Sequence, residues 1–175
     1  MYKTSKVVFS PRVRKSPYFN STIKYGVQAF SVYNHMYMPI SYEGTIEDYN
    51  NLLKGVQLWD VGVERQVQIK GPDAEALSQF LTPRNIKKCS IGQAMYAPFL
   101  DFKGGFINDP VMLKIDEDCY WFSLADGDAL LWTQGIAAGY RFDVDIHEPD
   151  VSPLQVQGPN SKELMVKVFG NWIND

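Results

Sequence analysis

Apolar and polar residues repeat with two different periods along the chain, and each period predicts one kind of element. Over residues 45–56, apolar side chains recur at helical spacing, and Glu47 and Asp48 stand where a helix dipole favours negative charge. Thr45 and Asp48 also have the spacing of a capping box. This pattern predicts an amphipathic helix that begins at Thr45.

After this helix the period becomes that of a strand. Residues 66–70 alternate between polar and apolar side chains up to Gly71-Pro72, so we expect a half-buried strand that ends there. Apolar residues then return to helical spacing. Residues 73–81 are therefore predicted to form a short helix with Asp73 as its cap.

The pattern in the next part of the chain predicts three strands, a third helix and a last strand. The strands cover residues 94–100, 111–115, 119–124 and 141–146, and the helix covers residues 126–139 with Asp126 or Asp128 as its cap. Lys103-Gly104-Gly105 predicts the turn between the first two of these strands. The order β-α-β-β-β-α-β indicates the α+β class. We expect a ferredoxin-like split β-α-β arrangement with an added strand over about residues 63–147.

The two ends of the chain contain elements that lack a covering surface. Residues 26–42 are strand-like and rich in aromatic side chains, and the tail predicts a strand, a turn and an amphipathic helix. We expect the ends to pack together as one discontinuous domain, residues 1–60 and 149–175, around a subdomain of residues 61–148. We also expect the chain to be the first portion of a longer protein.

Composition narrows the class of protein. With 45% hydrophobic residues, the chain of 175 residues can bury one large or two small cores, so disorder is excluded. The net charge is only −3, and the basic residues near the start form a short cluster, which argues against a nucleic-acid partner. We expect this cluster to lie in a solvated, partly flexible N-terminus; its members are Lys3, Lys6, Arg12, Arg14 and Lys15.

Residues that could bind a metal are few and badly spaced. Two cysteines, Cys89 and Cys119, and two histidines, His35 and His147, match no zinc motif, which favours reduced structural thiols over a metal site. No apolar run is long enough for a bilayer, and the first residues lack the apolar core of a signal peptide. We therefore expect a cytoplasmic protein with no metal and no membrane partner.

Four segments, taken in order and with their spacing, resemble the glycine cleavage T-protein (aminomethyltransferase) family of tetrahydrofolate-dependent methyltransferases. They are "MPISY" (residues 38–42), "LWDVGVERQVQIKGPDAEAL" (58–77), "YAPFLDFKGGFIND" (96–109) and "VQGP" (156–159). This resemblance implies a protein of three domains, the first discontinuous, with folate bound near the centre. The chain would then be the N-terminal half, with a ferredoxin-like subdomain inserted in an incomplete, T-protein-like folate-binding domain.

Within this family, the chain looks closest to the tetrahydrofolate-dependent dimethylsulfoniopropionate demethylase branch. The segments that carry this resemblance are "VYNHMYMP", "WDVGVERQVQIKG", "LTPRNIKKCSIGQ", "GGFINDPV", "LADGDALLW" and "EPDVSPLQVQGP". Where T-proteins show Ser-His-Met after Asp-Val, this chain has Gly62-Val63-Glu64, and where they show Asp-Asp it has Asn108-Asp109. These departures favour a methyl donor other than an aminomethyl group.

The resemblance implies that Asp109 is the acid that faces folate, because its distance from Tyr96 along the chain equals the interval in T-proteins. Transfer of a methyl group to a folate amine needs alignment more than strong acid or base groups. A carboxylate there can accept a hydrogen bond from the amine and stabilise positive charge on nitrogen, which makes Asp109 the candidate catalytic residue. In the alternative interpretation, Asp109 caps the turn before Pro110 and touches only backbone.

Three further residues are implied to bind the folate cofactor. Tyr96 matches a tyrosine of the folate pocket, Asn108 replaces the other acid, and Glu64 stands where T-proteins place a methionine near the pterin. The alternatives are a half-buried strand tyrosine for Tyr96 and a surface ion pair with Arg65 for Glu64.

A cationic methyl donor would be held by aromatic faces. Trp59 and Tyr33 are the candidate substrate-binding residues through cation–π attraction, with Tyr37 as a further possibility. For each of them, packing in the core is the alternative.

These observations leave three functional hypotheses. The first is the N-terminal portion of a methyltransferase or demethylase that moves a methyl from a small donor, such as dimethylsulfoniopropionate, to tetrahydrofolate. The second keeps the family but changes the donor to an aminomethyl group or an aryl methyl ether, and the third is a non-catalytic folate-binding module. The expected partners are folate, the donor, and either the C-terminal half or a second copy. We expect the portion alone to be inactive, because a site shared between domains loses walls when one is absent.

Overall fold

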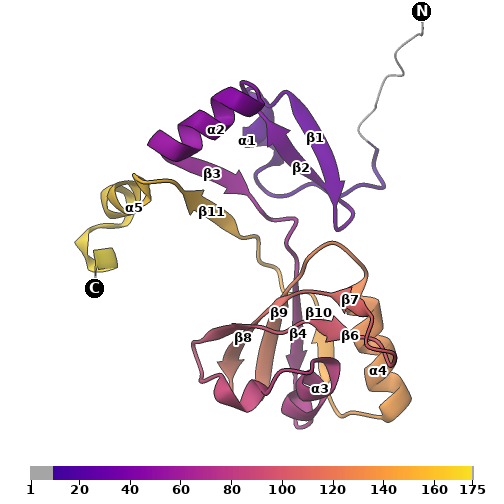
Figure 1. Cartoon of the computed structure of the whole chain (residues 1–175). Coiled ribbons are helices and arrows are strands. Elements are labelled where there is room, and N and C mark those ends of the chain that lie inside the picture. The colour runs from indigo at the N-terminus through magenta and orange to yellow at the C-terminus, as the bar shows by residue number, and fades with distance from the viewer. Residues whose placement is uncertain (1–9, 175) are drawn as a thin grey trace, which may run out of the picture. The chain divides into compact units, whose positions relative to one another are not determined.

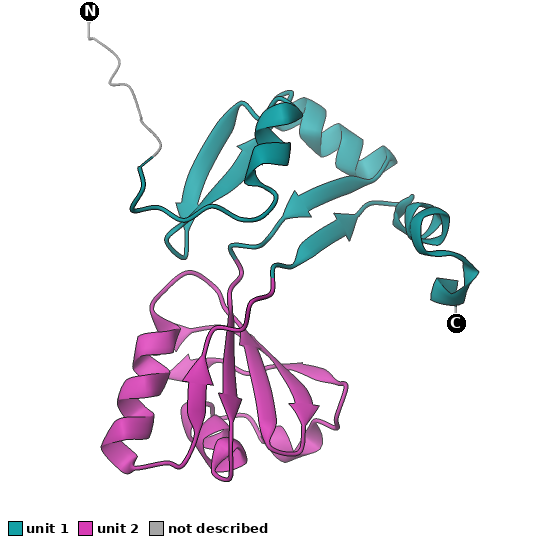
Figure 2. Cartoon of the chain, turned by 180° about the vertical axis from the view of Figure 1, so that it is seen from behind, with its two compact units in different colours: residues 1–63, 152–175 teal, residues 64–151 magenta. Residues whose placement is uncertain are grey.

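The computed structural model describes residues 10–174 and divides the chain into two compact units, shown in different colours in Figure 2. Unit 1 combines residues 1–63 with residues 152–175, and unit 2 comprises residues 64–151. Of the predicted basic cluster, Lys3 and Lys6 lie outside the described residues.

Unit 2 is built on a five-stranded sheet in the order β10-β4-β9-β8-β5, and every neighbouring pair is antiparallel (Figure 1). Its strands are β4 (Gln66–Lys70), β5 (Ala94–Tyr96), β8 (Val111–Asp116), β9 (Cys119–Ser123) and β10 (Asp145–His147). Two helices connect them, α3 (Ala74–Leu81) after β4 and α4 (Ala129–Tyr140) between β9 and β10, and a 3-10 turn, η1 (Ile86–Lys88), follows α3. Because β9 and β10 both run antiparallel to β4, α4 joins two strands that run in the same direction.

The core of unit 2 lies between the sheet and its two helices. Alternate residues of each strand turn toward the helices, so Val67, Ile69 and Phe122 are fully buried. They pack in one cluster with Leu77 of α3 and Ile136 of α4. The helices cover one face of the sheet, and on the opposite face Gln68, Trp121 and Ser123 are only partly buried.

The predicted strand over residues 94–100 is broken in the structure. Pro98 and Pro110 have no N–H group and interrupt the ladder on both sides, although Ala97 N still donates to Pro110 O at 3.0 Å. As a result β6 (Phe99–Leu100) leaves the main sheet and pairs with β7 (Phe106–Asn108) in a small ribbon. The predicted turn joins these two strands.

The last strand of unit 2 also differs from prediction. The last strand was expected over residues 141–146, but only Asp145–His147 pairs with β4. The reason is that Arg141 adopts a left-handed conformation (φ 60°) as the C-cap of α4, which turns the chain before the strand begins. At the other end of α4, Asp128 rather than Asp126 is the N-cap.

Unit 1 starts with a short helix, α1 (Phe19–Lys24), and a hairpin of β1 (Ala29–Tyr33) and β2 (Met36–Ser41). Sequence periodicity indicated one strand-like stretch here. The structure divides it at Asn34 and His35, whose positive φ angles of 47° and 59° form the two-residue turn that suits a twisted hairpin.

The helix predicted from Thr45 is α2 (Thr45–Lys54), but its cap and its end are different. Gly44 is the N-cap, and Asp48 reaches back to accept hydrogen bonds from Tyr42 N at 3.0 Å and Glu43 N at 3.2 Å. The helix stops two residues before Val56 because Gly55 ends it and the chain then enters a strand.

That strand, β3 (Gln57–Asp60), pairs antiparallel with β11 (Leu154–Gln157). The two ends of unit 1 therefore meet in one ribbon. After β11, Gly158 makes the turn with φ 131°, and a side chain there would come within 2.4 Å of Gly55 O. The chain continues into α5 (Ser161–Phe169) and a short 3-10 turn, η2 (Asn171–Asn174).

Within residues 10–174, none of the helices combines the length and the apolar character needed to cross a lipid bilayer.

Candidate functional site

One row of residues crosses the uncovered face of the unit 2 sheet near one end. Tyr96 of β5 lies opposite Val111 of β8, Val111 lies opposite Ser123 of β9, and Ser123 lies opposite Gln66 of β4. Directly opposed residues point to the same side of a sheet, so all four belong to one face. With neighbouring strands about 4.8 Å apart, the row is roughly 14 Å long. We call the side of the sheet that carries this row the open face.

A second row lies parallel to the first on the open face. Leu113 is opposite Trp121, and Trp121 is opposite Gln68. Trp121 Nε1 donates to Gln68 Oε1 at 2.9 Å, and Gln66 Nε2 donates to Ser123 Oγ at 2.9 Å. The open face is thus apolar on β5 and β8 and carries hydrogen-bonded amides on β4. Such a surface can hold a flat ring system against its apolar half and polar ring edges at the amides.

Asp109 is exposed and lies between β7 and β8, two residues before Val111. Within residues 10–174, its carboxylate takes part in no hydrogen bond or ion pair. The alternative in which Asp109 caps the turn before Pro110 therefore does not describe this structure. A carboxylate that is held on a strand end and has no partner of its own is available to a ligand.

Tyr96 is 47% exposed at the edge of the sheet. Its ring stands on the open face next to Val111, which is 42% exposed. The tyrosine is thus neither a core residue nor an isolated surface residue, because it extends an apolar strip that begins on β8.

Asn108 is 5% exposed, and its side chain is engaged on both of its polar atoms. Nδ2 donates to Ala125 O at 3.0 Å and to Asp126 O at 3.3 Å, and Oδ1 accepts from Ala125 N at 3.0 Å. The amide is therefore committed to the loop between β9 and α4.

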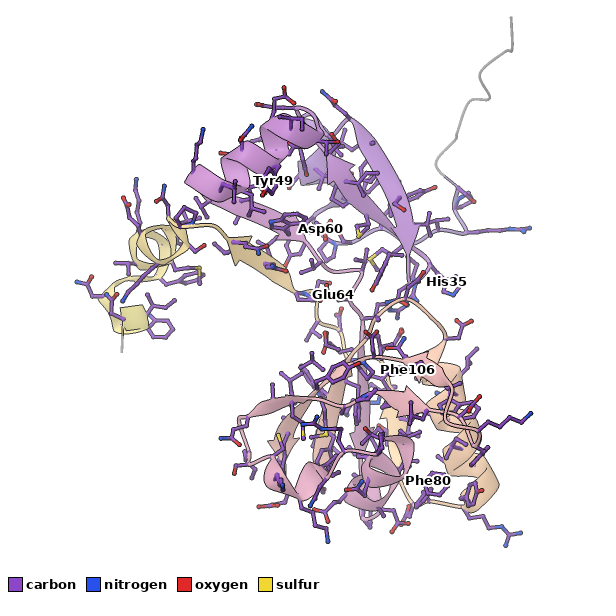
Figure 3. All side chains as sticks on the ribbon, viewed as in Figure 1. His35, Tyr49, Asp60, Glu64, Phe80 and Phe106 are labelled. Carbon is purple, nitrogen blue, oxygen red and sulfur yellow. The ribbon has the colours of Figure 1, made fainter. Side chains whose placement is uncertain are left out.

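Glu64 lies two residues before β4 and is half-buried (Figure 3). Burial raises the pKa of its carboxyl group above the ordinary value. The alternative ion pair with Arg65 is not formed, since the Arg65 guanidinium pairs with Glu148 instead. Among residues 10–174, no side chain neutralises the Glu64 carboxylate.

The structure brings the four predicted residues of unit 2 to the same end of the sheet. β4 and β8 begin there, and β5 ends there at Tyr96. Leu124, which follows β9, donates from its backbone N to Arg65 O at 2.8 Å, so the segment of Glu64 is tied to this end as well. Residues 64, 96, 108 and 109 thus converge although they are spread over 46 positions of the sequence.

The two predicted substrate-binding residues lie in unit 1. Trp59 stands on β3 opposite Gln155 and is 41% exposed, whereas Tyr33 is the last residue of β1 and is partly buried. Tyr37 is a core residue, because it is 5% exposed and its ring packs against Phe19 with centroids 5.8 Å apart.

Sequence reasoning missed the remaining residues of the open face. Val111, Leu113, Trp121 and Ser123 were recognised only as parts of strands. The signal that could have found them is the alternation within β8 and β9, since every second residue must turn away from the helices.

Among the described residues, no group of three or more His, Cys, Asp or Glu side chains is placed to hold a metal ion. Cys89 and Cys119 are both buried free thiols, and burial raises the pKa of Cys119. The chemistry of the open face thus depends on carboxylates, amides and aromatic rings.

Comparison with known proteins identifies the family to which the chain is similar. Residues 18–174 match the model of the family described as the GCVT N-terminal domain. The chain is 46% identical over 166 residues to the dimethylsulfoniopropionate demethylase of Ruegeria pomeroyi, which covers 95% of this chain and 46% of the demethylase. It is 29% identical over 137 residues to an aminomethyltransferase of Prosthecochloris aestuarii, which covers 75% of this chain and 38% of that enzyme.

A solved structure matches as well. The glycine cleavage system aminomethyltransferase T from Bartonella henselae aligns with a TM-score of 0.78 and 19% identity, over 89% of this chain and 43% of that protein. This match shows that the chain has the mixed helix and sheet fold of that protein. The chain spans less than half the length of the relatives it matches.

Proposed function

The chain belongs to the GCVT N-terminal domain family, and from this premise we propose that it is the N-terminal portion of a tetrahydrofolate-dependent demethylase. Its methyl donor would be a small cation of the dimethylsulfoniopropionate type. The observation that carries the proposal is the 46% identity, over nearly the whole chain, to a dimethylsulfoniopropionate demethylase. Identity to the aminomethyltransferase is lower, at 29%. We propose further that the protein is cytoplasmic.

We infer that unit 2 is a ferredoxin-like subdomain inserted into a discontinuous first domain. The strand order β10-β4-β9-β8 supports this, because two strand–helix–strand units interlock there with β5 added at the edge. The pairing of β3 with β11 supports the discontinuous domain, since it joins segments on either side of unit 2. The proposed boundaries are residues 1–60, 61–148 and 149–175.

We propose that tetrahydrofolate binds along the open face, where Tyr96 and Val111 would contact its ring system. The residues fit such a ligand, because the row offers an apolar strip and Asp109 adds a carboxylate that has no partner among residues 10–174. Glu64 would face the polar edge of the ring at the other end of the row. When bound, tetrahydrofolate would supply a secondary amine that takes the methyl group.

In this proposal Asp109 is the catalytic residue. Its carboxylate would accept a hydrogen bond from the folate amine, which aims the nitrogen lone pair at the methyl carbon. When bound, tetrahydrofolate would offer its amine to the methyl group, and the electrons of the carbon–sulfur bond would remain on the donor's sulfur. The Asp109 carboxylate would stabilise the positive charge that develops beside it.

The donor would be held by aromatic faces. Trp59 supports this assignment because 41% of its surface is exposed, so a sulfonium can approach the ring. Tyr33 is the second proposed contact. Folate and the donor are the proposed small-molecule partners, and the C-terminal half or a second copy would supply further walls of the site.

The test uses the full-length protein with tetrahydrofolate and dimethylsulfoniopropionate, and follows 5-methyltetrahydrofolate by mass spectrometry. Product is expected from the wild-type protein, with a loss of about 100-fold or more in Asp109→Asn. Asp150→Asn, at an exposed acid of the same unit, is the matched control and should retain full activity. Folate binding without any product would contradict the demethylase and leave an aminomethyltransferase or a non-catalytic folate module.

A further inference from the structure

The buried Asn108 side chain fastens two parts of unit 2 that are remote in sequence. On one side the chain continues directly from Asn108, the last residue of β7, into Asp109. On the other side the side chain forms three hydrogen bonds with the backbone of Ala125 and Asp126, at 3.0, 3.3 and 3.0 Å. We propose that Asn108 is a positioning residue, which sets the place of Asp109 relative to Glu64. This inference rests on the proposed function.

The connection to Glu64 runs through the same loop. Leu124 N donates to Arg65 O at 2.8 Å, one residue before the pair of bonds between Ala125 and Asn108. Residues 124 and 125 are thus held on one side by the segment that carries Glu64 and on the other by Asn108. If either connection were lost, the spacing between the two carboxylates across the open face would no longer be fixed.

The geometry requires an amide at this position. The side chain must give two N–H groups to carbonyl oxygens and accept one N–H group, and among side chains of this length only asparagine offers this set. A carboxylate would place negative charge against the carbonyls of Ala125 and Asp126, and an apolar residue would leave both unsatisfied. Gly127, the next residue of this loop, has a φ angle of 140°, a conformation that favours glycine.

A purely structural role makes a different prediction from a positioning role. If Asn108 only stabilised unit 2, its replacement would lower the melting temperature but leave the activity of each folded molecule intact. If it positions Asp109, kcat per folded molecule must fall as well, because reacting groups that shift by about 1 Å can lose two orders of magnitude in rate.

The experiment measures kcat for 5-methyltetrahydrofolate formation by the full-length protein between pH 5 and pH 8, below the melting temperature of each variant. In Asn108→Asp we expect a loss of roughly 100-fold at pH 8. This loss should shrink as the pH falls, because a protonated carboxyl group can again donate to Ala125 O. Asp109, Asp126 and Asp128 lie on the flanking segments, so each value is divided by the wild-type value at the same pH.

Two further variants separate the outcomes. Asn85→Asp is the matched control, since the Asn85 side chain only accepts a bond, from Lys87 N at 3.2 Å, and a carboxylate can replace it. Asn108→Ser keeps one donor and should lose less activity than Asn108→Asp at pH 8.

Activity of folded Asn108→Asp within about twofold of wild type, or a loss that does not depend on pH, would overturn the positioning role alone. The quantity that decides this test is the kcat of the variant divided by the kcat of the wild type. Absence of product from the wild-type protein would instead reject the proposed function, and the positioning role with it. The two failures are therefore told apart by the wild-type reaction.

Discussion

Unit 2 buries a continuous apolar core between one sheet and two helices, whereas α2 and α5 of unit 1 bury no residue at all. Ile46 and Tyr49 of α2 are 67% and 57% exposed, and Phe169 of α5 is 54% exposed. The same chain thus contains one unit with a continuous buried core and another in which α2 and α5 leave their apolar faces uncovered, while the short helix α1 buries Phe19.

Polar contacts also connect distant segments of unit 1. Ser16 donates to the buried carboxylate of Asp60, which also accepts from Gly62 N at 3.2 Å. Asn34 at the hairpin turn donates to Val63 O at 3.0 Å. Unit 1 therefore combines a small aromatic cluster around Phe19 and Tyr37 with hydrogen bonds between distant segments, whereas unit 2 has one continuous apolar core.

The largest expected effect comes from opening the core of unit 2. Phe122 is fully buried and its ring centroid lies 4.8 Å from that of Phe99, so Phe122→Ala should cost about 3–5 kcal/mol in the free energy of unfolding. Hydrogen-exchange mass spectrometry should show the loss of protection on peptides from β4 and β9. Phe169→Ala on the exposed face of α5 is the control, with an expected cost under about 0.5 kcal/mol. Equal costs would show that the two units do not differ in burial.

A smaller effect is expected from the polar contact in unit 1. Asp60→Ala removes two hydrogen bonds to a buried carboxylate, so we expect a loss of about 2–3 kcal/mol. Chemical denaturation, with hydrogen exchange to locate the change in unit 1, measures this loss. Asp150→Ala removes an exposed carboxylate and should change little. A loss no larger than in this control would mean that unit 1 does not depend on the Ser16–Asp60 contact.

The smallest effect concerns pH and Glu64. Burial raises the pKa of this carboxyl group in the folded protein above the ordinary glutamate value of 4.5. The folded state therefore binds the proton more tightly than the unfolded state does. The resulting stability is present below the unfolded pKa and is lost as the pH rises through the folded pKa.

The Glu64→Gln variant has no carboxyl group at this position, so it cannot lose stability in this way as the pH rises. Relative to wild type, the variant should therefore gain stability between about pH 4 and pH 7, by less than about 1 kcal/mol because the site is only half-buried. Thermal denaturation at each pH measures the difference. Glu43→Gln, at an exposed glutamate, should show no such trend, and a flat profile for Glu64→Gln would contradict the desolvation of Glu64.

The sequence predicted unit 2 better than unit 1 for a physical reason. In β4 polar and apolar side chains alternate at consecutive positions, so this strand can be predicted without knowledge of its partner strands. Neither β3 nor α1 was predicted. In the case of β3 the reason is that it becomes a strand only through pairing with β11, almost one hundred residues away. Pro98 was the local signal for the break between β5 and β6, and it was overlooked.

The candidate site shows the same division. The resemblance to T-proteins, through the interval between two matched positions, singled out Tyr96 and Asp109, which are close in sequence. The hydrogen bonds of Asn108 to Ala125 and Asp126 were not predictable, because no local pattern joins positions 17 and 18 residues apart. The positioning role that we propose for Asn108 is argued from these tertiary contacts.

The antiparallel pairing of β3 and β11 has a genetic consequence. Asp60 and Leu154 lie opposite each other, so the chain leaves unit 1 and re-enters it on neighbouring strands. If the codons for residues 64–151 are deleted and a short turn is put in their place, we expect β3 and β11 to remain paired as a hairpin.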